Sequence, residues 1–477
     1  MLNFRFHYII ENEVNFQISR PKFGSKNMSG DKECPWRPKF HFLAPSNWMN
    51  DPNGPIFYNN EYHLFYQYNP SGPQWGNIHW GHAKSKDLVY WEHLPIALEP
   101  SIEKGESHCF SGCCVINEAT PTIIYTSIGA NKTPAIGAEQ WLATSDDNMI
   151  TWEKYDRNPI MTNSLHKDLE VYDWRDPFIW KEDNEWNLIL GGHLKNPVRP
   201  LTLLYKSPNL IDWKFVKPLC IEDRSRGKNW ECPNFFKLNT HYLLIVSPHN
   251  KVIYSFGSFT NHEFNPIEWH VLAYGRLFYA TNGINTSNND IILWAWIKAV
   301  GSNHWNGCLT LPRTLSLSEH FTLTYQFPLQ LRKLRLEKYH IENYIVNNKI
   351  NVYPLKFENF CFEIKAEFQE LNAESIYFKL TDSNFLYKSE AIGYDIKSQI
   401  FWAGKDKTFK IEPKSDATLN IHIYIDMSII EIIINSKECI TTQIIPKESF
   451  SNTLELYVVN GSVKIKRLRV WNLKSIW

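Results

Sequence analysis

Short apolar runs alternate with polar turn residues along almost the whole chain after residue 35. The runs are rich in Ile, Val, Tyr, Phe and Trp, and they are separated by residues that favour turns, namely Asn, Asp, Gly and Pro. This pattern is typical of β-strands joined by turns. Because hardly any stretch has the period of an amphipathic helix, the sequence predicts an all-β protein.

The segment 1–34 does not share this pattern, and we expect it to form a loosely held N-terminal extension. Its apolar run is short and broken by Glu11, which makes it a poor match to a secretory signal. No segment approaches the length of a membrane span. Nine cysteines without a regular framework are typical of reduced thiols, so we expect a cytoplasmic protein with no membrane partner.

A tryptophan that follows a polar turn recurs at a nearly fixed interval. The interval from Trp91 to Trp152 equals that from Trp152 to Trp213, and a weaker fourth copy ends at Trp269 after a slightly shorter interval. The first three are each predicted to open a strand. Repeats of this kind mark repeated packing units, so we interpret these tryptophans as core residues and not as ligands of a substrate.

A second recurring feature begins each of five predicted hairpins. In three of them an acidic residue stands just before a proline, as Asp51-Pro52, Asp176-Pro177 and Glu231-Cys232-Pro233. The other two begin with Phe110-Ser111-Gly112 and Phe278-Tyr279-Ala280. Five repeats of about 50 to 65 residues, each long enough for a four-stranded sheet, predict a five-bladed β-propeller.

The propeller brings equivalent positions of its blades together. The innermost strand of each blade starts at the same end of the central channel, so the hairpin starts should surround one channel mouth. The residues expected there are Asp51, Ser111, Asp176, Glu231 and Tyr279. We expect an N-terminal extension over 1–34, the propeller over 35–331, a charged linker over 332–345, and a C-terminal β-sandwich over 346–477, where alternating runs such as IHIYIDMSIIEIII predict antiparallel strands.

Charge and composition narrow the class of partner. Lys and Arg together number 50, as do Asp and Glu, so there is no global field that would hold nucleic acid or an anionic membrane. A neutral small molecule fits this balance better. Aromatic residues make up 15% of the chain and include 19 Trp, a bias found in sheet cores and also in sugar sites. The sequence does not indicate an oligomeric state.

The three acids point to a reaction when they are taken together. One Asp before Pro commonly stabilises a turn, but clustered carboxylates repel each other and persist mainly in metal sites or in acid/base catalysis. The chain has no HxxxH, CxxC or aspartate-rich calcium loop beside them, so we predict no metal and no cofactor. Glycoside cleavage needs one carboxylate and one protonated carboxyl group. We expect the neighbouring carboxylates to raise the pKa of Glu231 and keep it protonated at neutral pH.

Several motifs resemble glycoside hydrolase family 32, the family of invertases and levanases. The stretch WMNDPNG over 48–54 is similar to the most specific motif of that family, and Arg175-Asp176-Pro177 and Trp230-Glu231-Cys232-Pro233 are similar to its other two, in the expected order. Weaker matches are LFYQYNP around Gln67, Trp75-Gly76, the two hairpin starts at Phe110 and Phe278, Leu311-Pro312-Arg313 and, in the second domain, DMSIIE over 426–431. The resemblance covers nearly all of the chain after residue 35.

The resemblance implies a retaining β-fructofuranosidase that splits sucrose or sucrose 6-phosphate. Asp51 would be the nucleophile, Glu231 the acid and base, and Asp176 would hold fructose hydroxyls and stabilise the transition state. The implied substrate-binding residues are Trp48, Asn50, Gln67, Trp75, Phe110, Ser111, Arg175, Tyr279 and Trp296. Two aspartates usual in the family before Phe-Tyr-Ala are missing, because the chain reads LAYGRL over 272–277.

Other functions stay open on the sequence. A fructan hydrolase or a fructosyltransferase of the same family would use the same fructosyl-enzyme, and a catalytically silent fructoside-binding protein would keep the pocket without turnover. A five-bladed inverting glycosidase acting on arabinose or xylose units also uses three acids, but WMNDPNG and the second domain argue against it.

Overall fold

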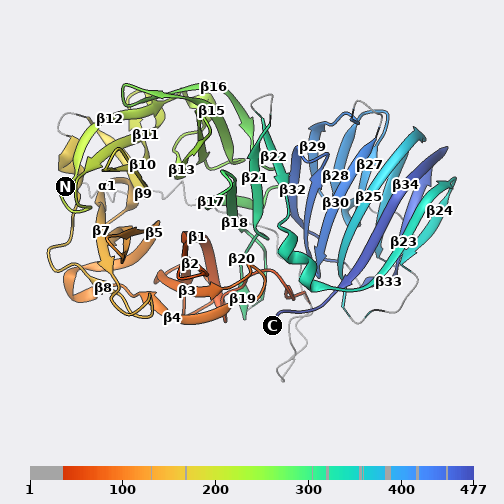
Figure 1. Cartoon of the computed structure of the whole chain (residues 1–477), viewed down its shortest axis with the longest axis horizontal. Coiled ribbons are helices and arrows are strands. Elements are labelled where there is room, and N and C mark those ends of the chain that lie inside the picture. The colour runs from red at the N-terminus through yellow and green to blue at the C-terminus, as the bar shows by residue number, and fades with distance from the viewer. Residues whose placement is uncertain are drawn as a thin grey trace, which may run out of the picture. The chain divides into compact units, whose positions relative to one another are not determined.

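The computed structural model describes residues 36–129, 132–166, 169–302, 304–318, 322–353, 357, 359–381, 388–414, 418–446 and 449–477. The predicted N-terminal extension over 1–34 lies outside these residues. The regular secondary structure of the described chain is almost entirely strand, as the sequence predicted (Figure 1). Its helical segments are short: α1 (Pro134–Gly137) and the 3-10 helices η1 (Ile102–Lys104), η2 (Asn163–His166), η3 (Arg224–Arg226), η4 (Leu329–Leu334) and η5 (Lys388–Glu390).

Five antiparallel sheets follow one another along the first part of the chain, and the main strands of each run in chain order from an inner to an outer strand. The first contains β1 (Asn47–Tyr58), β2 (Glu61–Asn69), β3 (His79–Ser85) and β4 (Glu92–Leu98). The second contains β5 (Glu106–Asn117), β6 (Thr120–Gly129), β7 (Ala138–Thr144) and β8 (Glu153–Lys154). The third contains β9 (Val171–Glu182), β10 (Glu185–Lys195), β11 (Val198–Ser207) and β12 (Lys214–Ile221).

The last two sheets close the ring. The fourth contains β13 (Glu231–Leu238), β14 (His241–Ser247), β15 (Ile253–Thr260) and β16 (Glu263–Val271), and the fifth contains β17 (Phe278–Asn285), β18 (Ile291–Ile297), β21 (Arg313–Leu317) and β22 (Leu323–Gln326), with β20 (Cys308–Leu309) paired to β18. Each inner strand contacts the inner strand of the next sheet, and β17 contacts β1. The short strand β19 (Trp305–Asn306) pairs in parallel with β1. The predicted five-bladed propeller is therefore confirmed (Figure 1).

Every inner strand is interrupted at the same place, which is the start of the predicted hairpin. The register with the second strand shifts between Met49 and Pro52, between Cys109 and Gly112, between Glu231 and Asn234, between Tyr279 and Thr281, and at the Asp176 position of β9. Such shifts are β-bulges, which re-aim side chains. Proline suits a bulge because it cannot donate to the ladder, so the bulge explains why proline follows each acid.

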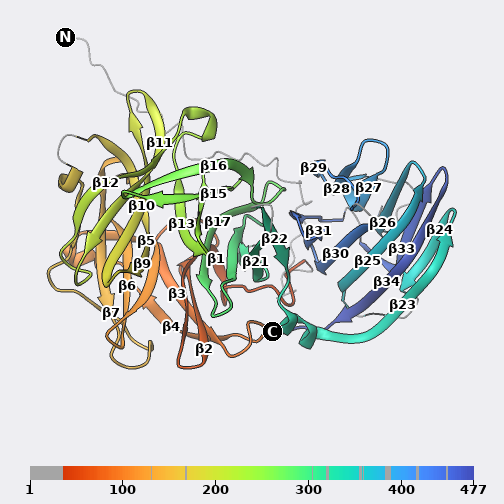
Figure 2. The same ribbon diagram turned by 45° about the horizontal axis from the view of Figure 1, so that its top comes forward.

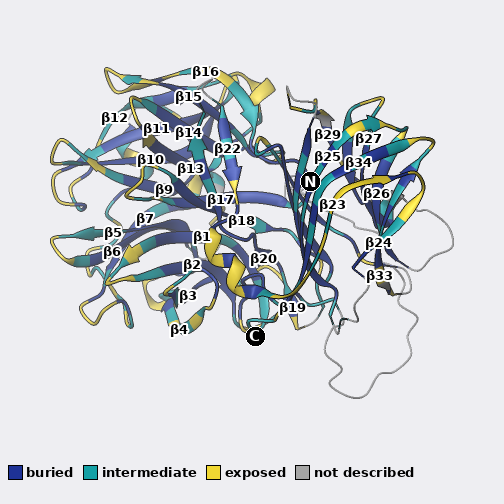
Figure 3. Ribbon diagram, turned by 45° about the vertical axis from the view of Figure 1, so that its right-hand side comes forward, coloured by how far each residue is buried: buried dark blue, intermediate teal, exposed yellow. Residues whose placement is uncertain are grey.

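The repeated tryptophans belong to the packing between strands. Trp91, Trp152 and Trp213 each lie one residue before the outermost strand of a sheet, while Trp269 lies inside β16. All four pack against hydrophobic clusters of the propeller. Their predicted structural role is confirmed, and Figure 3 shows how far burial extends through the sheets.

The rest of the chain forms two six-stranded sheets, as expected for a β-sandwich (Figure 2). One contains β23 (Arg335–Val346), β34 (Ser462–Leu473), β25 (Cys361–Asn372), β30 (Leu419–Asp426), β31 (Ile429–Ile434) and β32 (Glu438–Gln443). The other contains β24 (Lys349–Tyr353), β33 (Phe450–Val459), β26 (Ser375–Thr381), β27 (Ala391–Asp395), β28 (Ile400–Ala403) and β29 (Asp406–Lys410). A continuous cluster of apolar residues from both sheets fills the space between them.

The segment 332–345, predicted to be a linker, instead contains the end of η4 and most of strand β23. β23 is an edge strand of its sheet, and most of its residues are exposed or half-buried. Charged residues are common on edge strands because they discourage pairing with other chains. The charges that suggested a connection therefore belong to an exposed strand. No helix among the described residues is long and apolar enough to cross a membrane.

Candidate active site

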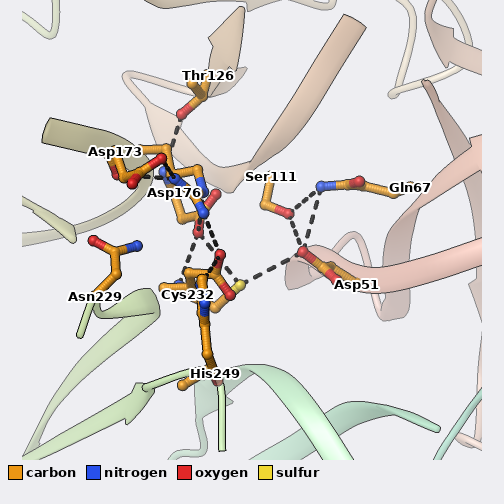
Figure 4. Close-up of polar contacts among 12 residues, drawn as sticks. Asp51, Gln67, Ser111, Thr126, Asp173, Asp176, Asn229, Cys232 and His249 are labelled. Carbon is orange, nitrogen blue, oxygen red and sulfur yellow. Dashed lines mark hydrogen bonds and ion pairs between the residues drawn. The ribbon is translucent and has the colours of Figure 1, made fainter. Parts of the chain in front are cut away.

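The five hairpin starts lie on the five inner strands, and hydrogen bonds and ion pairs connect the residues that they carry. Asp51 is on β1, Ser111 on β5, Asp176 on β9, Glu231 on β13 and Tyr279 on β17. Figure 4 shows Asp51, Ser111, Asp176 and Cys232 turned toward one another from different strands. The sequence thus predicted correctly that these positions converge, although they lie far apart along the chain.

Asp51 is held in one orientation by a network of neutral donors. The Ser111 hydroxyl donates to Oδ2 at 2.6 Å, and Asn50 Nδ2 donates to Oδ1 at 3.0 Å. Gln67 links these two partners, since it accepts from Asn50 at 2.7 Å and its amide donates to Ser111 at 2.5 Å. Three residues predicted to bind substrate therefore orient the predicted nucleophile.

Asp176 is buried on a strained stretch of backbone. Its φ of 64° lies in the left-handed region, and its N–H donates to the Thr126 hydroxyl at 3.0 Å. The Cys232 N–H donates to Asp176 Oδ2 at 2.9 Å. The Cys232 thiol lies between two acids, 3.5 Å from Asp51 and 3.6 Å from Asp176. Cys232 thus connects the two aspartates, and the strand that carries Glu231 also positions Asp176.

Glu231 is surrounded by donors, and this corrects the sequence-based expectation for its protonation. The Arg175 guanidinium forms an ion pair with Oε1, His249 Nε2 lies 2.7 Å from the same oxygen, and the Tyr279 hydroxyl donates to Oε2. Burial raises the pKa of Glu231, but Arg175 and His249 lower it more, so its pKa lies well below the usual value. The prediction that neighbouring carboxylates keep Glu231 protonated is therefore wrong for the free site, because cations surround this acid more closely than anions do.

The pKa values of the two aspartates are shifted in the opposite direction. Burial raises the pKa of Asp51, although Ser111 and Asn50 oppose the shift. Burial, together with the charges of Glu231 and Asp51, raises the pKa of Asp176 to about 7 against the opposing effect of Arg175. The site thus contains three carboxyl groups in three different electrostatic environments. Chemically, it offers one oriented nucleophile, one carboxylate bound by cations, and one carboxyl group that titrates near neutral pH.

Four predicted aromatic residues line this region with less direct contact to the acids. Trp48 donates its indole N–H to Asn50 at 2.8 Å, and its ring packs on Trp296 at 5.6 Å between centroids. Phe110 precedes Ser111, and the 45%-exposed Trp75 packs on it edge to face at 6.1 Å. Trp48 thus contacts Asn50, and Phe110 is adjacent in the chain to Ser111, so each aromatic pair adjoins one hydrogen-bond partner of Asp51.

Two family models match the chain: the glycosyl hydrolases family 32 N-terminal domain over residues 41–328, and the glycosyl hydrolases family 32 C terminal over residues 330–472. The chain belongs to glycosyl hydrolase family 32. It is therefore a glycoside hydrolase, and the resemblance seen in its motifs is confirmed.

Family 32 relatives match along most of their own length. The chain is 31% identical to a sucrose-6-phosphate hydrolase of Zymomonas mobilis, covering 98% of this chain and 97% of the relative. It is 32% identical to a levanase of Bacillus subtilis, over 93% of this chain and 71% of the levanase. Among solved structures, it resembles a family 32 β-fructofuranosidase of Bombyx mori with a TM-score of 0.77 and 25% identity, over 93% of this chain and 95% of the other.

Two further residues lie near Glu231 but belong to none of the family 32 motifs. They are His249 and Lys298. Both follow the second strand of a blade: the end of β14 pairs Ser247 with Glu231, and the end of β18 pairs Ile297 with Phe278. The Lys298 ammonium lies 3.6 Å from the centre of the Tyr279 ring. The sequence did contain a usable signal, because the end of a second strand must lie beside the start of the first in every blade.

The stretch that lacks the two family aspartates packs against the sandwich. Ala273 is buried, and Tyr274 exchanges backbone hydrogen bonds with β32, donating to Cys439 at 2.7 Å and accepting from Thr441 at 3.1 Å. Arg276 forms an ion pair with Asp406 of β29 at 3.0 Å. An aspartate in place of Ala273 would be buried, so alanine fits this packing.

Proposed function

We propose that the protein is a retaining β-fructofuranosidase that hydrolyses sucrose or sucrose 6-phosphate, releasing fructose and glucose or glucose 6-phosphate. The observation that carries this proposal is the linked set of three carboxyl groups, Asp51, Asp176 and Glu231, each contributed by a different propeller blade. The names of the relatives support the substrate class, and a family 32 neighbour from Bombyx mori has been solved in complex with sucrose.

In the first step, Asp51 attacks the anomeric carbon of the fructosyl unit while Glu231 gives a proton to the departing oxygen. Asp51 suits this role because Asn50 and Ser111 fix its carboxylate, while Oδ1 accepts one hydrogen bond within the described residues and keeps a lone pair for attack. In the second step, Glu231 takes a proton from water, the water attacks the same carbon, and Asp51 leaves. Two displacements retain the configuration.

Asp176 has a different task from the other two acids. It accepts from the Cys232 backbone and is positioned by Thr126, so its remaining acceptor capacity faces the site. A carboxylate there binds fructose hydroxyls and stabilises the positive charge of the oxocarbenium-like transition state. The rings of Trp48, Trp296, Phe110 and Trp75 supply apolar faces for the sugar rings.

We further propose a cytoplasmic location and no requirement for a metal or cofactor. The eight cysteines among the described residues are all buried and free, which suits a reducing compartment. A cytoplasmic location favours a disaccharide over a long fructan. A fructan hydrolase is the second candidate, because the levanase of Bacillus subtilis is as similar to this chain as the sucrose-6-phosphate hydrolase is.

The test is a product profile of the purified protein on sucrose, sucrose 6-phosphate, inulin and levan. We expect release of fructose from sucrose or its 6-phosphate at a higher kcat/KM than from either polymer. Oligosaccharides that grow with sucrose concentration would instead identify a fructosyltransferase. Sucrose binding by calorimetry without any product would identify a silent binding protein, and no turnover of all four substrates by folded protein would refute the proposal.

A further inference from the structure

Glu231 receives three donors in the described part of the chain, and they differ in their ability to give up a proton. The Arg175 guanidinium remains protonated at all physiological pH values. Burial raises the pKa of the Tyr279 hydroxyl well above its usual value, so this group also keeps its proton. Histidine is the side chain that ordinarily titrates between pH 5 and 8. Of these three side chains, the imidazole of His249 is the one whose residue type commonly serves as a proton donor and acceptor in catalysis.

The proposed reaction creates a need for such a proton. Glu231 must be a carboxylic acid when the glycosidic oxygen departs, but Arg175 favours its carboxylate form. No rearrangement of backbone is required to supply the proton, because His249 Nε2 already lies 2.7 Å from Glu231 Oε1. A proton that passes between the two groups therefore has to cross only one hydrogen-bond length.

The fold holds the imidazole in this place from two sides. His249 is two residues beyond Ser247, the register partner of Glu231, so the turn after β14 runs beside the acid. The His249 N–H donates to the Tyr279 hydroxyl at 3.0 Å, and its φ of 62° is in the left-handed region. The His249 side chain is 33% exposed, so its ring contacts both Glu231 and solvent. The same tyrosine that binds Glu231 therefore also holds the backbone that carries this imidazole.

We propose that His249 is a positioning residue for Glu231 that also stores the proton used in glycoside cleavage. This inference rests on the proposed function. Before cleavage, the proton on His249 Nε2 passes to Glu231 Oε1, leaving a neutral imidazole and a carboxylic acid. Glu231 gives that proton to the departing oxygen as the C–O bond breaks. In the second step Glu231 takes a proton from the attacking water, and this proton returns to His249 when fructose leaves, so the cycle is balanced.

The pH dependence follows from the charged groups around this pair. Glu231 contacts the imidazole directly, Arg175 shares Oε1 with it, the Tyr279 hydroxyl accepts from its backbone, and the Lys298 ammonium lies over the Tyr279 ring. The active free enzyme has one proton on the His249–Glu231 pair, so the alkaline limb of kcat/KM reports loss of that proton from the pair. Without His249, the proton must reside on Glu231 alone beside Arg175, and it is lost at lower pH.

The experiment compares His249→Gln with the wild type on two substrates over a range of pH. Gln keeps an N–H donor for Glu231 but does not titrate. With sucrose we expect kcat/KM at neutral pH to fall by about 10- to 100-fold. With 4-nitrophenyl β-D-fructofuranoside, whose phenol leaves without a proton, we expect a loss below about threefold. The alkaline limb of the sucrose profile should move to lower pH.

His262→Gln is the matched control, because His262 is exposed on the β15–β16 turn and has the same φ of 62°. It should behave as the wild type on both substrates. Equal losses of His249→Gln on both substrates with an unmoved alkaline limb would show a purely structural role and overturn the proposal, as would wild-type activity on sucrose. His249→Asn, which tolerates the left-handed backbone better, must repeat the Gln result. A wild-type protein inactive on both substrates would instead refute the proposed function.

Discussion

Glu431→Gln tests whether one buried carboxylate holds the propeller and the sandwich strands together. Glu431 Oε2 accepts from Arg313 Nη2 at 2.5 Å, and Oε1 lies 3.0 Å from His41 Nε2 and accepts from the Leu311 N–H at 2.6 Å. Glu431 and His41 are fully buried, and Arg313 is 2% exposed. Burial raises the pKa of Glu431, but Arg313 and His41 lower it more, so the carboxylate is charged.

The expected loss of stability comes from the buried positive charge that the substitution leaves without a partner. Removing one partner of a buried ion pair costs about 3–5 kcal/mol. At about 2.1 cal/mol/K of unfolding entropy per residue, the compact unit Trp36–Trp477 has roughly 0.9 kcal/mol/K, so Tm should fall by about 3–5 °C. Differential scanning calorimetry of the full chain measures this shift.

The control for this experiment is Glu370→Gln, the same substitution at an exposed pair of the sandwich. Glu370 lies 3.1 Å from Lys464 and is 56% exposed. Exposed pairs contribute little, so we expect Tm to change by no more than about 1 °C. A Glu431→Gln protein with the Tm of the control would show that the buried pair does not stabilise this junction, and the reasoning would be refuted.

Three further outcomes are expected from the same structure. Burial lowers the pKa of His41, but hydrogen bonds and charges of Asp426 and Glu431 outweigh it and raise the pKa to about 9. The stability that protonated His41 contributes is therefore complete below its unfolded pKa of about 6.5 and is lost as pH rises through about 9. The urea midpoint should fall more between about pH 6 and 10 for the wild type than for His41→Asn. Asp176→Asn should lower kcat/KM on sucrose by about 100- to 1,000-fold with an unchanged Tm within about 2 °C, and activity within about tenfold of wild type would contradict its assigned role. Gly112→Ala should lower both Tm and activity, because a Cβ would lie 2.2 Å from the Ile124 carbonyl oxygen beside Ser111; thermal scans and sucrose assays matching wild type would contradict this.

The sequence predicted the parts of the structure that depend on repetition and local pattern. Five similar hairpin starts gave the blade number and the residues at the channel mouth, because blade geometry places equivalent positions together. The prolines after Asp51, Asp176 and Glu231 were read as turn features, and the structure shows them in bulges of the inner strands. Turns and bulges both accommodate proline because it has no backbone N–H, so the place of each acid at an interruption of a strand was predictable.

The electrostatics of the site could not be predicted in the same way. Burial, with a smaller contribution from the neighbouring carboxylates, raises the pKa values of Asp51 and Asp176. The prediction for Glu231 was wrong because Arg175 and His249 reach this acid from another blade and from a turn. Whether a charge that is distant in the chain lies within an ion-pair distance depends on side-chain direction, which no sequence pattern encodes. Strand β23 was not predicted for the same reason. Its charged residues suggested a linker, and only the structure shows that it pairs with β34.

The central claim is that Asp51 is the nucleophile of a fructoside hydrolase, and the initial rate of glucose release from sucrose tests it most directly. Asp51→Ala should lose at least about 1,000-fold in kcat, because no other group replaces a covalent nucleophile. The control is Asp212→Ala, since Asp212 is exposed on the turn before β12 and should leave the rate unchanged. A folded Asp51→Ala protein that releases glucose at the wild-type rate would contradict the account.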